Sequence, residues 1–204
     1  MPQLLRPRAT AGQEGDEVVG LEVHRHRGEP QVEPGCQGCL SEIAEAADVA
    51  RPTVFAHFAR KEDLLFDRYP EAEALVVAAI NDRPAGTSAV AALSTLLIDL
   101  ADQGHPLSAM RAQFTRFWEV VAESRALQSR ARELLDHLEQ AIATAMDRTD
   151  VPDAPLSAAL TVAAYRTVHL ESVRRILAGD DADKVAADHR RRISSALARV
   201  DYAR

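Results

Sequence analysis

From Ser41 onward, apolar residues recur along the chain at the three- and four-residue spacing of an amphipathic helix. Short polar or proline-bearing joints interrupt the pattern around residues 82–86, 104–106, 150–155 and 179–181. No stretch alternates apolar and polar residues in the way that a half-buried strand does. This periodicity predicts an all-α protein, built from helices that each bury one face.

Residues 1–40 differ in composition from the rest of the chain. They hold six of the nine glycines and four of the ten prolines, and they lack both aromatic residues and a sustained apolar period. Such a segment cannot bury enough apolar surface to offset the entropy of ordering it, so we expect residues 1–40 to be disordered or non-native.

The bulk composition limits the classes of protein to which the chain can belong. A formal net charge of -7 argues against a non-specific coat for nucleic acid, although a local basic face can still meet DNA. The sequence has neither an apolar run of about 18 residues nor a secretory leader. The two cysteines, Cys36 and Cys39, fit a reducing compartment. We therefore expect a cytoplasmic protein that is not in a membrane.

Four apolar stripes describe the helices expected after residue 86. Three of them are Leu93, Leu96, Leu97 and Leu100; Met110, Phe114, Phe117 and Val121; and Leu127, Leu134, Leu138, Ile142 and Met146. In the fourth, Leu156, Ala163, Leu170 and Leu177 recur every seven residues, which gives a wide apolar face that can pack on two neighbours. A last helix is expected at about residues 182–200. The final two helices can supply half of an intermolecular four-helix bundle, so we expect a homodimer.

Residues 41–58 have the pattern of two short helices that meet at a tight turn. Small side chains such as Ala44 and Ala47 permit a close approach, and Asp48 stands at the turn, where aspartate tolerates positive φ. Pro52 lies in the first turn of the second helix, where it removes no intrahelical hydrogen bond. A hairpin of this kind either packs within a core or presents its second helix to the major groove of DNA.

The residues that follow the turn distinguish these alternatives. The segment TVFAHFARKEDLL, residues 53–65, closely resembles the TetR family pattern of threonine, an aliphatic and an aromatic residue, then His-Phe, lysine, an acid and leucine. The resemblance implies a helix-turn-helix DNA-binding domain at residues 41–69, followed by a helical ligand-binding and dimerisation domain at residues 70–204. It also implies a transcriptional regulator, in most cases a repressor that a small molecule releases from a palindromic operator in double-stranded DNA.

The resemblance assigns roles by position. Arg51 is the candidate for reading guanine, because its planar fork matches O6 and N7. The hydroxyl of Thr53 can donate a hydrogen bond to a phosphate. The ammonium of Lys61 and the exposed amides at the start of the next helix can hold a phosphate as well. His57 either reaches a phosphate or completes the packing of the helices. The predicted DNA-binding residues are Arg51, Pro52, Thr53, Phe55, Ala56, His57 and Lys61.

One part of the family pattern is missing. Family members place an amphipathic helix before the hairpin, but residues 28–40 here hold two prolines and three glycines and are a poor helix. We hypothesise that the first 40 residues derive from a shifted reading frame or a misplaced start. A helical dimer that binds a ligand or a protein but has lost DNA binding is therefore the alternative function.

Neither a metal site nor catalysis is expected. His24, His26, Cys36 and Cys39 are ligand types that zinc accepts, but their spacing matches no common finger. The sequence lacks a glycine-rich phosphate loop and the HExxH and GxSxG motifs. We therefore expect a protein that is not an enzyme and that holds no cofactor or metal.

Bulky and polar-tipped residues on the central helices indicate where a ligand would bind. A cavity among them suits an apolar or amphipathic small molecule, although each of these residues is also an ordinary core residue. Trp118 and Tyr165 need a polar partner if they are buried, which a ligand or a neighbour can provide. The predicted ligand-binding residues are Phe114, Phe117, Trp118, Tyr165 and His169.

Overall fold

The computed structural model describes residues 58–202, together with Glu45, Ala50 and Pro52. Its six α-helices after residue 68 are α3 (Tyr69–Asn81), α4 (Ala89–Asp102), α5 (Thr115–Glu123), α6 (Arg125–Arg148), α7 (Ala154–Leu177) and α8 (Ala182–Tyr202). Three short 3-10 helices precede α3 and α5, namely η1 (Lys61–Leu64), η2 (Pro106–Ser108) and η3 (Ala112–Phe114). The described residues contain no strand, and the all-α prediction is confirmed.

Local sequence signals set the ends of these helices. Ser88 and Ser124 cap α4 and α6, because each side-chain oxygen accepts a hydrogen bond from a backbone amide of the first turn, that of Ala91 at 3.0 Å and that of Leu127 at 3.3 Å. Gly104 and Gly179 follow α4 and α7 with positive φ, a conformation that costs glycine little. The joints expected from the sequence therefore separate helices in the structure.

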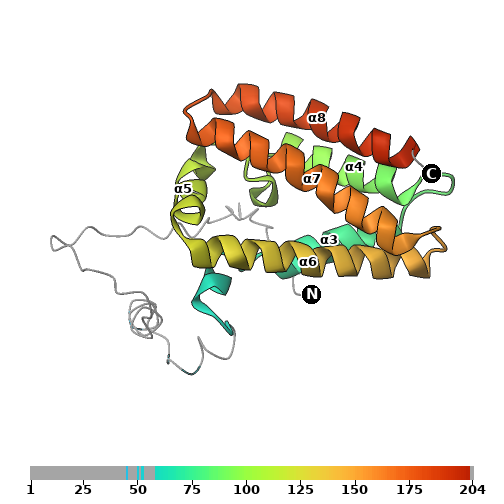
Figure 1. Cartoon of the computed structure of the whole chain (residues 1–204), viewed down its shortest axis with the longest axis horizontal. Helices are drawn as coiled ribbons and strands as arrows, with labels where there is room; N and C mark the ends of the chain where they lie inside the picture. The colour runs from blue at the N-terminus through green and yellow to red at the C-terminus, as the bar shows by residue number, and fades with distance from the viewer. Residues whose placement is uncertain (1–44, 46–49, 51, 53–57, 203–204) are drawn as a thin grey trace, which may run out of the picture. The chain divides into compact units, whose positions relative to one another are not determined.

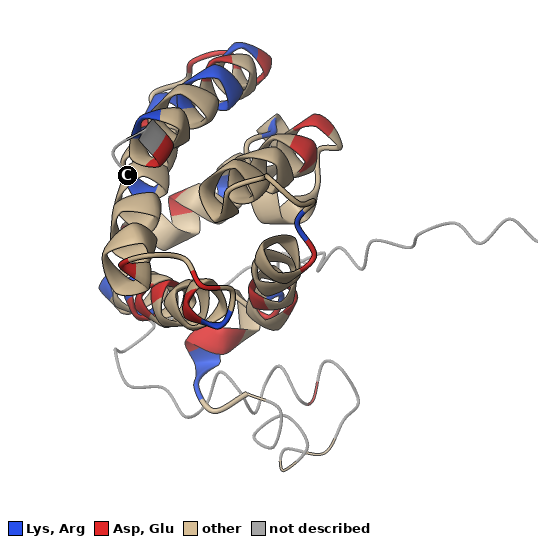
Figure 2. Cartoon of the chain, turned by 90° about the vertical axis from the view of Figure 1, so that its right-hand side faces the viewer, with Lys and Arg blue, Asp and Glu red and all other residues tan. Residues whose placement is uncertain are grey.

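Five of the helices form a closed ring. Helix α3 packs on α4, α4 on α8, α8 on α7, α7 on α6, and α6 returns to α3. Figure 1 shows α6, α7 and α8 side by side with α4 behind them, and Figure 2 views these helices closer to end-on, with charged residues on their outer sides. The short α5 contacts α6 and α7 near one end of the ring.

The core is divided into two clusters of buried residues. The larger cluster lies towards the start of α7 and includes Ile80, Met146 and Leu197, each fully buried. The smaller cluster joins Met110 to Val173, Ile176 and Val185, towards the end of α7. The apolar stripes of the sequence therefore face inward, but they do not form one continuous core.

One stripe does not form a single helix as expected. Met110 lies in a loop and Phe114 ends η3, so that only Phe117 and Val121 belong to α5. The backbone turns sharply at Ala109, which has a left-handed φ of 46°, and the helix cannot begin until after this residue. Met110 is nevertheless 1% exposed, so periodicity identified its burial but not its secondary structure.

The long α7 has a row of leucines that the described residues leave exposed. Leu156 is 56% exposed, Leu160 43% and Leu170 45%, and Leu177 continues the same face. The apolar stripe of α8, in contrast, is turned towards the ring, with Val185, Ile193 and Leu197 buried. No helix of the described residues is long and apolar enough to cross a membrane.

Candidate functional site

A short connector, residues 58–69, leads from the helix-turn-helix segment into the ring. It contains η1 and a series of turns, and α3 then begins at Tyr69. Pro70 explains this interruption, because proline lacks the amide that would donate to Phe66 in a continuous helix and its ring clashes with that turn. The amide of Tyr69 instead donates to the carbonyl of Phe66 at 3.0 Å.

Ion pairs hold the connector against α6. Nε of Arg130 donates to Oδ1 of Asp63 at 2.6 Å, and both side chains are less than one-fifth exposed. Glu133 accepts from Nη1 of Arg60 at 2.7 Å and from Nη1 of Arg130 at 3.1 Å. The Arg60–Glu133 pair is exposed and contributes little, whereas the shielded Asp63–Arg130 pair defines the position of the connector.

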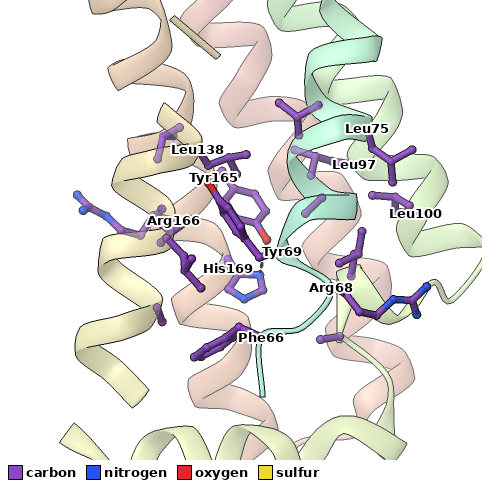
Figure 3. A pocket seen from close by; sticks show the side chains of 18 of the residues that line it. Phe66, Arg68, Tyr69, Leu75, Leu97, Leu100, Leu138, Tyr165, Arg166 and His169 are labelled. Carbon is purple, nitrogen blue, oxygen red and sulfur yellow. Dashed lines mark hydrogen bonds between the residues drawn. The ribbon is translucent and has the colours of Figure 1, made fainter. Parts of the chain in front are cut away.

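A cavity of about 430 Å³ lies inside the ring, next to the larger core cluster. Its volume falls within the usual range of sites for small molecules. One wall is the connector itself, from Leu65 to Tyr69, and leucines of α3, α4 and α6 line much of the remainder (Figure 3). All five predicted ligand-binding residues, Phe114, Phe117, Trp118, Tyr165 and His169, also line it.

A series of ring contacts runs across the cavity from the connector to α8. Phe66 meets Phe117 edge to face at 6.1 Å between ring centroids, and Phe117 meets Trp118 at 4.7 Å. Trp118 in turn contacts His169 at 5.1 Å, and His169 contacts His189 on α8 at 5.9 Å. The series therefore links the connector to α8 through residues that line the cavity.

The polar tips in this region have protein partners. Nε1 of Trp118 donates to the carbonyl of Ala109 at 2.7 Å, and the Tyr165 hydroxyl lies 3.2 Å from Nδ1 of His169. Burial raises the pKa of Tyr165 to about 12. Burial, with the neighbouring His189 as a smaller cause, lowers the pKa of His169 to about 3. At neutral pH the tyrosine and this histidine are both uncharged.

Tyr69 is the exception in the cavity wall. Among the described residues, its hydroxyl is the buried side-chain polar atom that has no hydrogen-bond partner. Burial raises the pKa of Tyr69, and so does the nearby Glu73 carboxylate. The two side chains are not placed so that they form a hydrogen bond. An unpaired buried hydroxyl is costly, so a small rotation of Tyr69 or a bound molecule that pairs with it would be favourable.

The predicted DNA-binding residues fall mostly outside the described part of the chain. This applies to Arg51, Thr53, Phe55, Ala56 and His57. Pro52 is helical and exposed, and Lys61 is exposed at the first position of η1. The adjoining amide of Arg60 donates to the Asp63 carboxylate at 3.1 Å and is therefore already paired within the connector. The possible metal ligands His24, His26, Cys36 and Cys39 also lie outside the described residues.

Comparison with known proteins identifies the segment before α3. Residues 38–67 match the family described as bacterial regulatory proteins, tetR family. This match supports a regulator of the TetR family. No curated protein and no solved structure matches it. A TetR-family regulator is a DNA-binding transcriptional regulator with a helix-turn-helix, as the resemblance implied.

Several residues of this site escaped the sequence reasoning. Phe66, within the family segment, and Tyr69, just beyond it, both line the cavity. Asp63 and Arg130 are 67 residues apart in the chain. Pro70 was the available signal for the connector, since it predicts a helix break there. Nothing in the sequence pairs Asp63 with Arg130, because such a contact depends on how η1 lies on α6.

Proposed function

We propose that this TetR-family regulator is a dimeric, sequence-specific repressor that a small-molecule ligand releases from its operator. The observation that carries the proposal is the position of the connector. Residues 65–69 form a wall of the cavity, and they overlap the end of the family segment, which extends to residue 67. A ligand in the cavity therefore contacts the chain that leads to the helix-turn-helix.

The contacts of the connector suggest how binding is transmitted. Phe66 rests on Phe117 on the cavity side, while Asp63 is paired with Arg130 on α6. A ligand that moves Phe66 or α6 changes the alignment of this ion pair and so shifts the connector. The ligand can change DNA affinity only if it binds the protein more tightly with the connector in one position than in another. We expect the contacts of Phe66 and Asp63 to be the origin of that difference.

The uncovered face of α7 supports a homodimer. Leu156, Leu160, Leu170 and Leu177 lie at helical spacing and are all more than one-third exposed. Several exposed leucines on one helix face are typical of an interface between proteins. A dimer of this kind has to hold its two recognition helices about 34 Å apart, one turn of DNA, because two half-sites require that spacing.

A fluorescence-anisotropy titration with the DNA that flanks the gene tests the DNA-binding part of the proposal. Lys61→Ala should weaken binding to all sequences and reduce the slope of log affinity against log salt by about one. Lys184→Ala, at an exposed lysine on α8, is the matched control and should leave binding unchanged. Arg51→Ala should relax the preference at one base pair in each half-site. Uniform loss with unchanged preference would exclude that role for Arg51.

The alternative function is a helical dimer that binds a ligand without binding DNA. The family match begins only at residue 38, and the preceding residues hold the prolines and glycines noted in the sequence. The hairpin would then lack the helix that covers it in other family members. The same titration decides between the two functions, because this alternative requires no preference for the flanking DNA over a scrambled duplex.

A further inference from the structure

The charged side chains at the edge of the cavity do not enter it. Arg68 is exposed and makes two hydrogen bonds to Glu71, at 2.7 and 3.2 Å. Arg166 is exposed as well, and Figure 3 shows both guanidinium groups directed away from Tyr165 and His169. Asp67 completes the ionised residues of the lining and is also exposed. Among the described residues that line the cavity, none therefore presents a buried charge that could pair with an ionic ligand.

Tyr165 and His169 provide a specific polar group in this apolar space. The Tyr165 hydroxyl lies 3.2 Å from Nδ1 of His169. Because a phenol is a stronger acid than a neutral imidazole, we assign the donor role to Tyr165, which leaves the imidazole proton on Nε2. Among the described residues, Nε2 has no hydrogen-bond partner, and this atom is not fully buried. His169 lines the cavity, and we take its Nε2 as the donor that the residue offers there.

We infer that the cavity binds an uncharged, largely hydrocarbon or aromatic molecule, which accepts a hydrogen bond from Nε2 of His169 through a carbonyl or ether oxygen. The inference rests on the proposed function and gives the chemical class of its ligand. A volume of about 430 Å³ accommodates on the order of 15 non-hydrogen atoms, since one water molecule occupies about 30 Å³. An ion would lose its hydration without gaining a counter-charge, and it is excluded for that reason.

Four probes of one shape test the inference. Pentylbenzene carries no polar group, and phenyl butyl ketone carries one acceptor. The 5-phenylpentanoate anion carries a negative charge, and 5-phenylpentylamine carries a positive charge. Titration calorimetry with the full chain gives each dissociation constant. The emission of Trp118, the single tryptophan of the chain, shows whether the probe enters the cavity that this residue lines.

The ketone should bind about 3- to 10-fold more tightly than pentylbenzene, the gain that one net hydrogen bond corresponds to. It should bind at least ~100-fold more tightly than either ion. His169→Phe should abolish the advantage of the ketone over pentylbenzene, whereas His169→Gln, which retains a donor near the position of Nε2, should preserve part of it. Circular dichroism of both variants verifies that they fold.

Three results would overturn the inference: equal binding of an ion and the ketone, a ketone advantage that survives His169→Phe in the folded variant, or no binding of any probe. The proposed function has its own test, because the Lys61→Ala titration with DNA requires no ligand. Failure of the ligand class with intact operator binding is therefore distinct from failure of the regulator itself.

Discussion

The two histidines at the end of the ring contact series should make the stability of the fold depend on pH. His189 is 6% exposed, and its Nδ1 lies 3.0 Å from the hydroxyl of Ser172. Burial lowers the pKa of His189 to about 4, with Arg192 adding to the effect and Asp188 opposing it. The pKa of His169 is lowered to about 3. Both side chains are therefore neutral in the folded protein at pH values where they are protonated in the unfolded chain.

The sign and size of the effect follow from proton linkage. Between the unfolded pKa of about 6.5 and the folded values, the unfolded chain binds more protons, so stability is complete above pH 7 and falls as the pH falls. From pH 7 to pH 5 the loss is about 2 kcal/mol for each histidine. The contribution of His169 is an upper limit, because water can enter the cavity beside it. A total loss of about 2–4 kcal/mol is a large part of the usual 5–15 kcal/mol.

Urea unfolding at pH 7, 6 and 5, followed by far-ultraviolet circular dichroism, measures this loss. His189→Asn cannot be protonated and retains an amide near Ser172, so it should reduce the dependence by about 2 kcal/mol. A double variant with His169→Gln should be nearly independent of pH in this range. His137→Asn changes an exposed histidine of α6 and serves as the control. The reasoning is refuted if the wild type and His189→Asn lose the same stability between pH 7 and pH 5.

The unfolding measurements end at pH 5 because carboxylates titrate below that pH and also change the stability. Burial alone would raise the pKa of Asp188, but hydrogen bonds from Arg175 and Arg191 hold it below its ordinary value. Stability from this group is present above its unfolded pKa and is lost as the pH falls through the folded one. Above pH 5 the carboxylate stays ionised in both states, and the histidines account for the change.

Three further outcomes are expected. Met146→Ala in the larger core cluster should lower the free energy of unfolding by about 2–5 kcal/mol in urea titrations; a loss below about 1 kcal/mol would contradict its complete burial. Leu156→Glu combined with Leu160→Glu should convert the proposed dimer to a monomer in sedimentation analysis with the helical content kept, and an unchanged mass would exclude the α7 interface. Arg130→Ala should alter the ratio of DNA affinities with and without ligand by several-fold, and Asp63→Ala should then add little, since both remove one pair; additive effects would show that the pair does not transmit binding.

The sequence alone determined the secondary structure class and the family. Helical periodicity requires only the local spacing of apolar residues, and it gave the range of α4, α6, α7 and α8 to within a few residues at most ends. The segment from Thr53 to Leu65 indicated the family because its residue types stand at fixed distances along the chain. The five predicted ligand-binding residues reach the cavity because bulky side chains on central helices have few other places to lie.

Tertiary structure decided what depends on contacts between distant segments. Leu93 and Leu97 of α4 have the same four-residue spacing as Leu156 and Leu160 of α7, yet Leu93 is buried while Leu156 and Leu160 are exposed, since the described residues cover only one face of α7. The pairing of Asp63 with Arg130 and the approach of His169 to His189 are likewise fixed by how η1, α6, α7 and α8 pack. Local spacing specifies which face of a helix is apolar, but only packing determines what that face meets.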